Sequence, residues 1–218
     1  MKVAIIESGG ANFLSVVTAL EKLGVDCEIT HNSEKIKSAD AVILPGVGSA
    51  GFAMQRLNDY GLYSVISALK QPVLGICLGM QLFYECSAED NTKCLGIIPG
   101  QIQSFGQEDG IKVPHMGWNN LTLKTDTNEQ NYKSNIAINH EPILSGIASS
   151  DDVYFVHSYY APINEATVAS CDYGFKFSAV VRTKNFYGMQ FHPEKSGAVG
   201  VRLLTNFIET ANANLSGN

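Results

Sequence analysis

The N-terminal third of the chain alternates short strand-like runs with longer amphipathic stretches, and this alternation restricts the fold more than any other feature. The runs occupy residues 3–6, 25–30, 41–44 and 73–76. Apolar residues at helical spacing follow the first run and end at Gly24, and a second helical stretch covers about 50–70 with a break near Gly61. Strands that alternate with helices in this way predict right-handed βαβ units and a parallel sheet.

After about residue 95 the pattern changes to shorter candidate strands, at 97–98, 102–105, 153–156, 167–169, 179–181 and 187–191. They predict an antiparallel or mixed sheet joined to the parallel one. Polar residues 122–150 predict a surface excursion, and 197–212 a final helix. We therefore predict an α/β fold with one domain at 1–211, a mainly parallel central sheet flanked by helices, a smaller mixed sheet, and a polar tail at 212–218.

Composition excludes several classes of protein. The 218-residue chain has a net charge of −6 and a pI near 5.3, which argues against a nucleic-acid-binding surface. Its start is too short and too soon charged for a signal peptide, and no apolar stretch approaches a membrane span. The five cysteines form no C-x-x-C pair and fit free thiols in a reducing cytoplasm (27, 77, 86, 94 and 171).

Cys77 lies where the strand at 73–76 meets a helical pattern that includes Leu78, Leu82 and Phe83. Gly75 and Gly79 flank it at minus two and plus two, which is the nucleophile-elbow pattern with sulfur in place of a hydroxyl. A thiol at a helix N-terminus also favours the thiolate. A small buried core residue would fit the same run, and the pentapeptide alone leaves the two interpretations evenly balanced.

A glycine-rich loop, Pro45-Gly46-Val47-Gly48-Ser49, directly follows the third run. It lacks the Lys-Ser/Thr of a phosphate-binding loop and the full dinucleotide pattern. The loop either allows a tight turn or supplies a backbone N–H group to an oxyanion beside the elbow. In elbow hydrolases the second donor is the N–H group after the nucleophile, here that of Leu78.

His192-Pro193-Glu194 follows the candidate strand at 187–191. A nucleophilic cysteine needs a base, and the base needs a partner that orients its ring. His192 and Glu194 are close enough in sequence to supply both roles from one extended segment. The tripeptide alone favours a different interpretation, a strand end capped by polar residues at the surface.

Together these pieces resemble the class I (triad) glutamine amidotransferases, through 75–81 and 191–194. Further similar stretches are 45–48, 114–119, 154–159 and 185–197, and the resemblance runs from Met1 to about residue 211. It implies a flavodoxin-like core and a chemistry in which the cysteine attacks the carboxamide of glutamine, releasing ammonia and then glutamate. No cofactor or metal is expected.

The resemblance also implies the roles of individual residues. Cys77 would be the nucleophile, His192 the base and then the acid, and Glu194 its orienting partner. The backbone N–H groups of Val47 and Leu78 would form the oxyanion hole. Glutamine would be bound by five residues, with Glu89 on its α-ammonium group: Gly46, Gln81, Glu89, Ser158 and Tyr159.

Within the family, the resemblance is to glutaminase subunits that form heterodimers with a (β/α)₈-barrel cyclase, which makes imidazole glycerol phosphate in histidine biosynthesis. Trp118 and Asn119, in an expected Gly-Trp-Asn turn, are candidate interface residues, although a buried core tryptophan is a common alternative. The long 122–150 stretch and the unusual residues 7–10 leave open a paralogue that supplies ammonia for sugar amidation. The residues also fit a stand-alone cysteine hydrolase or a non-enzymatic binding module.

Overall fold

The computed structural model describes residues 1–9, 13–106, 110–124 and 141–216. An eight-stranded sheet in the order β2-β1-β3-β4-β14-β13-β12-β9 runs through the molecule. Its first five strands are parallel, and the order of these strands is that of a flavodoxin-like core. They are β1 (Lys2–Ile6), β2 (Asp26–Thr30), β3 (Ala41–Gly46), β4 (Val73–Cys77) and β14 (Phe186–Met189).

Helices cover both faces of the parallel strands, which explains why β3 and β4 are buried throughout. Alternate residues of β1 belong to separate clusters: Val3 packs with α1 (Phe13–Lys22) and α6 (Gly197–Ser216), and Ala4 with the helices of the other face. Those helices are α2 (Ser33–Ser38), α3 (Ala50–Asp59), α4 (Tyr63–Ser67) and α5 (Leu78–Gln81). The predicted parallel sheet and its flanking helices are confirmed.

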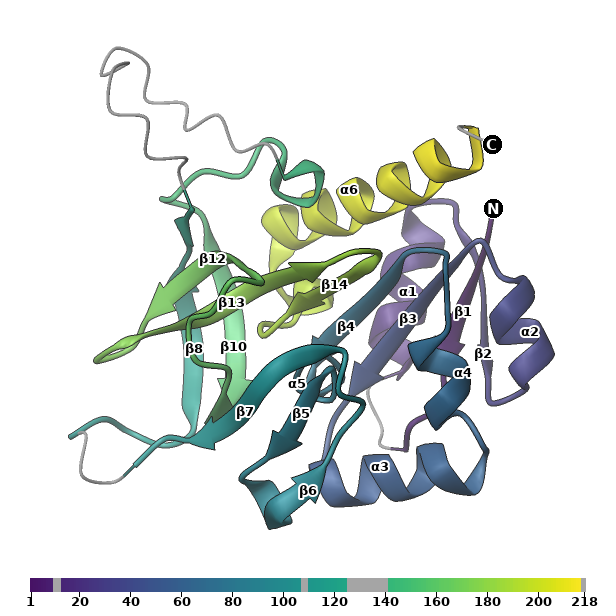
Figure 1. The fold of residues 1–218 in the computed structure, drawn as a ribbon. Helices are drawn as coiled ribbons and strands as arrows, with labels where there is room; N and C mark the ends of the chain where they lie inside the picture. Colours follow the sequence, from purple (N-terminus) through teal and green to yellow (C-terminus); the bar gives the residue numbers. More distant parts are fainter. Residues whose placement is uncertain (10–12, 107–109, 125–140, 217–218) are drawn as a thin grey trace.

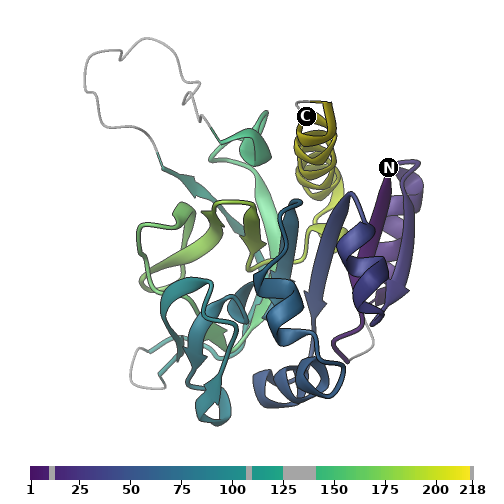
Figure 2. The ribbon, with the colours of Figure 1, turned by 45° about the vertical axis from the view of Figure 1, so that its right-hand side comes forward.

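The other half of the molecule consists of short strands, which lie to one side of the parallel half in Figures 1 and 2. Antiparallel β13 (Lys176–Thr183), β12 (Thr167–Asp172) and β9 (Thr122–Leu123) extend the central sheet. A two-stranded sheet pairs β8 (His115–Asn120) with β10 (Asp152–His157). A four-stranded mixed sheet has the order β11-β7-β5-β6, with β5 (Tyr84–Ser87), β6 (Thr92–Lys93), β7 (Ile98–Ser104) and β11 (Tyr159–Tyr160).

Two sequence-based expectations, one about α5 and one about β8, are wrong. The helix after Cys77 ends at Gln81, because the next residues form hydrogen bonds with another segment: the carbonyl of Leu82 accepts from Leu95 at 2.9 Å. Trp118 lies in the middle of β8 and not in a turn, because β8 pairs with β10 along its whole length. Both errors come from pairing between distant segments, which local sequence patterns do not record.

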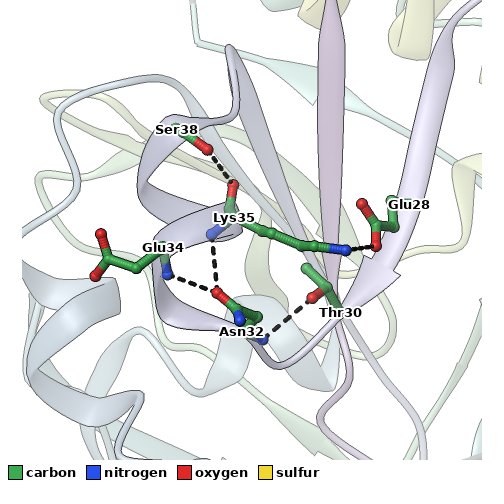
Figure 3. Close-up of polar contacts among 6 residues, drawn as sticks. All are labelled: Glu28, Thr30, Asn32, Glu34, Lys35 and Ser38. Carbon is green, nitrogen blue, oxygen red and sulfur yellow. Dashed lines mark hydrogen bonds and ion pairs between the residues drawn. The ribbon is translucent and has the colours of Figure 1, made fainter.

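Helix α2 is an element that the sequence analysis does not assign, and its first turn is held by a side-chain cap (Figure 3). The Asn32 side-chain oxygen accepts hydrogen bonds from the backbone N–H groups of Glu34 and Lys35 at 2.9 and 3.1 Å. Lys35 also forms an ion pair with Glu28 on β2, the edge strand of the sheet. The cap explains how a six-residue helix with a single buried side chain, Ile36, is stable at this edge.

Several predictions concern residues outside the ranges that the structure describes. The excursion predicted at 122–150 falls mainly on 125–140, and the last residue of the unusual stretch 7–10 is also outside these ranges, so neither is tested there. Helix α6 continues to Ser216, beyond the expected end at 212. The division into a domain at 1–211 and a tail at 212–218 stays a prediction. In the part of the chain that the structure describes, no helix is both long and apolar enough to cross a membrane.

Candidate active site

Cys77 is the last residue of β4 and immediately precedes α5. Its backbone has φ +53° and ψ −110°, a conformation that a residue with a side chain rarely adopts. A Cβ atom on Gly79 would lie 1.7 Å from the carbonyl oxygen of Leu44, and one on Gly75 2.7 Å from the Gly79 carbonyl. Both flanking glycines are therefore required by close backbone packing, as the elbow pattern predicts.

His192 and Glu194 are brought to the elbow by β14, which lies parallel to β4 with Met189 opposite Ile76. The Nδ1 atom of His192 lies 2.7 Å from Oε1 of Glu194, and their side chains are 2% and 0% exposed. The backbone around them is anchored, since the His192 N–H donates to the Tyr154 carbonyl at 2.9 Å. The hypothesis of a polar surface strand end is wrong for these residues.

The pKa of His192 reflects two opposing effects. Burial alone lowers it, but the hydrogen bonds and negative charges of Cys77 and Glu194 outweigh burial and raise the pKa to about 10. The imidazole beside the Cys77 sulfur therefore carries a proton at neutral pH. This is the arrangement in which a cysteine is nucleophilic and a proton is ready for a leaving group.

A cavity of about 360 Å³ opens in front of Cys77. Every residue predicted for the triad, the oxyanion hole and the glutamine pocket lines it, except Glu194, which lies behind His192. The lining residues are Gly46, Val47, Gly48, Cys77, Leu78, Gln81, Glu89, Pro114, Val156, His157, Ser158, Tyr159, His192 and Lys195. The glycine loop is held beside the elbow, since Gly46 pairs with Cys77 in the sheet and the Ser8 hydroxyl donates to the Pro45 carbonyl at 2.8 Å.

Two predicted glutamine-binding residues already have protein partners. The Gln81 side-chain amide donates to the Tyr159 carbonyl and to the Gln190 side-chain oxygen, each at 2.9 Å. The Glu89 carboxylate accepts from the Ala50 N–H group at 2.7 Å, and burial raises its pKa despite that hydrogen bond. Glu89 is the first residue of a short 3₁₀ helix at Glu89–Asn91, and it lines the cavity.

Sequence reasoning missed several residues around the sulfur. The Val156 carbonyl and the Gln190 side-chain nitrogen each lie 3.8 Å from Sγ of Cys77, and His157 and Lys195 line the cavity. A signal existed for Gln190 alone, as a polar residue inside the apolar run at 186–191. The other residues come from β10 and from the turn after His192, and local sequence patterns do not predict where these segments lie relative to β4.

The outer face of the β8–β10 pair carries exposed apolar side chains close to this cavity. Met116 and Trp118 are 62% and 57% exposed, and the Trp118 ring lies 5.8 Å from that of Tyr154. Trp118 is thus a surface residue and not a core tryptophan. The side chain of Asn119 lies on the opposite face of β8 from that of Trp118. Its amide donates to the Asp172 carbonyl at 3.0 Å and lies 3.5 Å from His115.

Comparison with known proteins agrees with this architecture. The model of the family "Glutamine amidotransferase class-I" matches residues 4–211. A solved glutamine amidotransferase superposes with a TM-score of 0.70 at 18% identity, covering 96% of this chain and 98% of that one. The chain belongs to the class I glutamine amidotransferase family.

Individual relatives share a higher sequence identity with this chain than that solved structure does. The imidazole glycerol phosphate synthase subunit HisH of Pasteurella multocida is 48% identical, over 95% of this chain and 97% of that protein. The HisH subunit of Xanthomonas euvesicatoria is 44% identical, over 95% and 96%. Within the family, the chain belongs to these HisH subunits, which makes it a glutamine amidotransferase of histidine biosynthesis. The alternative of a non-enzymatic binding module is therefore wrong.

Proposed function

We propose that Cys77 releases ammonia from L-glutamine and that the chain supplies this ammonia to a (β/α)₈-barrel cyclase in a heterodimer. The observation that supports the proposal best is the buried contact between His192 and Glu194 beside a cysteine in an elbow conformation. The partner would use the ammonia to make imidazole glycerol phosphate and an aminoimidazole carboxamide ribotide. With five free cysteines, the chain fits a reducing cytoplasm.

The first chemical step forms a thioester. The Cys77 thiolate attacks the carboxamide carbon, and the carbonyl electron pair moves onto oxygen. The N–H groups of Val47 and Leu78 are the proposed donors to this oxyanion. Leu78 is the first residue of α5, and the first N–H groups of a helix have no acceptor within the helix. The His192 imidazolium then gives its proton to the nitrogen, the C–N bond breaks, and ammonia leaves.

The second step hydrolyses the thioester. His192, now neutral, accepts a proton from water as the water oxygen attacks the thioester carbon. The C–S bond breaks, glutamate forms, and the thiolate and the imidazolium are restored. Glu194 keeps Nδ1 of His192 as a donor, so that Nε2 is the nitrogen that moves the proton.

Substrate binding is proposed for the part of the cavity beyond the elbow. Glu89 would hold the α-ammonium group, since an ammonium partner favours the ionised carboxylate that burial disfavours. The backbone of Ser158 and Tyr159, and Gly46 on the opposite side, would contact the rest of glutamine. Gln81 would act partly through the Tyr159 carbonyl that it holds.

The partner would dock on the exposed face of β8 and β10. Met116, Trp118 and Tyr154 form a continuous apolar surface there, and Val156 on the same pair lines the catalytic cavity. A partner on this face could therefore influence the site directly. Asn119, also proposed at the interface, would contribute through its neighbours, because its side-chain amide is bonded to the Asp172 carbonyl on the strand face opposite Trp118.

The test is Cys77→Ala in the complex with the cyclase. Glutamine-dependent product formation is expected to fall by about 10⁴-fold or more, while activity with added ammonium stays at the wild-type rate. Retained glutamine use would overturn the proposal. A free subunit as active on glutamine as the complex would instead indicate a stand-alone hydrolase.

A further inference from the structure

A chain of polar contacts connects the Cys77 sulfur to buried side chains other than His192. The Gln190 side-chain nitrogen lies 3.8 Å from Sγ, and the Gln190 oxygen accepts from the Gln81 amide at 2.9 Å. The same Gln81 nitrogen donates to the Tyr159 carbonyl at 2.9 Å. Gln190 and Gln81 are 0% and 4% exposed, so water does not compete for these contacts.

The chain continues through two buried histidines. Nδ1 of His157 lies 2.7 Å from the Tyr159 carbonyl oxygen, and Nε2 of His157 lies 3.0 Å from Nδ1 of His115. Nε2 of His115 lies 3.5 Å from the amide nitrogen of Asn119. The two histidines face each other across the β8–β10 pair, at the residue pair His157↔His115.

The chemistry of these groups allows one arrangement of hydrogens. A carbonyl oxygen only accepts, so His157 must donate from Nδ1. Burial lowers the pKa of His157 to about 3 and that of His115 to about 4, so both rings are neutral at pH 7. Nε2 of His157 is then an acceptor, and His115 must donate to it from Nδ1.

The same reasoning orients the amide next to the sulfur. Gln81 uses its nitrogen on Tyr159 and on Gln190, so the Gln190 atom that faces Gln81 must be its oxygen. The Gln190 nitrogen is therefore directed to Cys77. The Val156 carbonyl also lies 3.8 Å from Sγ and can accept the proton of the neutral thiol. The thiol has an acceptor in Val156, and the thiolate has a donor in Gln190.

We propose that Gln190 is a further catalytic residue, whose side-chain N–H donates to the Cys77 thiolate, and that His157 and His115 are positioning residues that hold it through Tyr159 and Gln81. The inference deepens the proposed function and rests on it. Hydrogen bonds to an ionised acceptor are about twice as strong as neutral ones, so the contact favours the thiolate over the thiol. The other ionisable groups around the sulfur are His192 with Glu194 behind it, His157, and Glu89 and Lys195 on the cavity wall.

The experiment compares Gln190→Glu with wild type in the full-length chain, through the pH dependence of Cys77 alkylation by iodoacetamide. Glutamate keeps the size of the side chain and an oxygen for Gln81, but it places an oxygen where the donor N–H was. The alkylation curve is expected to move to higher pH, with at least a tenfold lower rate at pH 7. An unchanged curve would overturn the role of Gln190.

Two further variants separate this role from a loss of folding. Gln190→Met removes the donor without adding charge and should move the curve in the same direction by a smaller amount. Gln71→Met is the matched control, because the Gln71 amide donates to the Ile36 carbonyl at 2.9 Å and does not line the cavity. It should leave the curve in place. A shift in the control as large as that in Gln190→Met would mean that general destabilisation causes both.

The histidine part of the proposal has its own readout. His157→Phe removes the donor to Tyr159 and should move the alkylation curve upward, whereas His157→Asn keeps a donor near Nδ1 and should restore it in part. Loss of stability without any shift in the curve would make His157 merely structural. Failure of the proposed function is distinguishable, since it would appear as glutamine use by the Cys77→Ala complex, whatever the Gln190 variants do.

Discussion

His192 and His157 line the same cavity and are almost equally buried, yet their pKa values move in opposite directions. The pKa of His192 is raised to about 10, and that of His157 is lowered to about 3. Burial lowers both. The difference lies in their partners, since His192 meets the anionic groups of Cys77 and Glu194 whereas His157 meets a carbonyl and a neutral histidine.

This comparison shows how one residue type performs two tasks within a single site. An imidazole beside a carboxylate stays charged and can move a proton during the reaction. An imidazole without an anionic partner stays neutral, and its two nitrogens become one fixed donor and one fixed acceptor. The charged imidazole suits proton transfer, and the neutral imidazole suits the positioning of neighbouring groups.

Removing the charged histidine should have the largest effect. In the complex, His192→Asn is expected to lower the rate of glutamate release by about 10⁴–10⁶-fold, because the proposed mechanism assigns the proton transfer of both steps to this imidazole. The matched control is His31→Asn, since His31 is exposed and does not line the cavity. A loss of less than tenfold for His192→Asn would remove the basis for treating the two cavity histidines as different.

Removing the carboxylate charge beside His192 should lower its pKa, in the direction of the pKa of His157. In Glu194→Gln, burial is no longer opposed by the carboxylate, so the pKa of His192 falls. The rate of glutamate release should drop by about 10²–10⁴-fold. NMR titration of the His192 ring checks the pKa, with Glu141→Gln as a control because Glu141 pairs with Arg182, outside the cavity. An unchanged titration would refute the assigned cause.

The neutral pair should control stability in acid. The pKa values of His115 and His157 are lowered by folding, so between about pH 6.5 and 4 the unfolded chain binds more protons, and stability falls as the pH falls. Each histidine contributes a slope of up to about 1.4 kcal/mol per pH unit. His192 has the opposite sign: its contribution is complete below about pH 6.5 and is lost as the pH rises toward about 10.

His115→Phe tests this sign, because phenylalanine can keep the stacking on Tyr173 at a ring distance of 4.0 Å. In urea unfolding, the free energy of unfolding of the variant should change less steeply between pH 6.5 and 4 than that of wild type. Above pH 7 the two slopes should agree. Equal slopes in acid would show that His115 is not neutralised by folding.

The smallest effect is expected for Asn119→Ala in the free subunit. The Asn119 amide is 3.5 Å from His115, a long contact, and 3.0 Å from the Asp172 carbonyl. Its loss should lower the free energy of unfolding by about 1 kcal/mol. The His192 titration should not change, and a shift there would mean that Asn119 reaches the charged histidine as well.

The parallel half of the fold follows from local sequence patterns, and the short-strand half does not. Continuous apolar runs identify β1, β3 and β4, because strands buried on both faces need apolar residues at every position. By contrast, β5, β8 and β11 contain polar or exposed residues and are strands only because a distant partner pairs with them. For this reason local patterns extend the elbow helix too far and predict a turn at Trp118.

The sequence by itself determined the elbow, because Gly75, Cys77 and Gly79 act within one short segment whose backbone must turn sharply. With His192 and Glu194 in one tripeptide, it also supplied the candidates for the proposed triad. Only the tertiary structure decided the surroundings of the sulfur, where Gln190, His157 and the Val156 carbonyl meet from β10 and the end of β14. Neighbouring residues determine local backbone geometry. Burial and the charge of a partner, which give His192 and His157 their different pKa values, arise only when distant strands pack together.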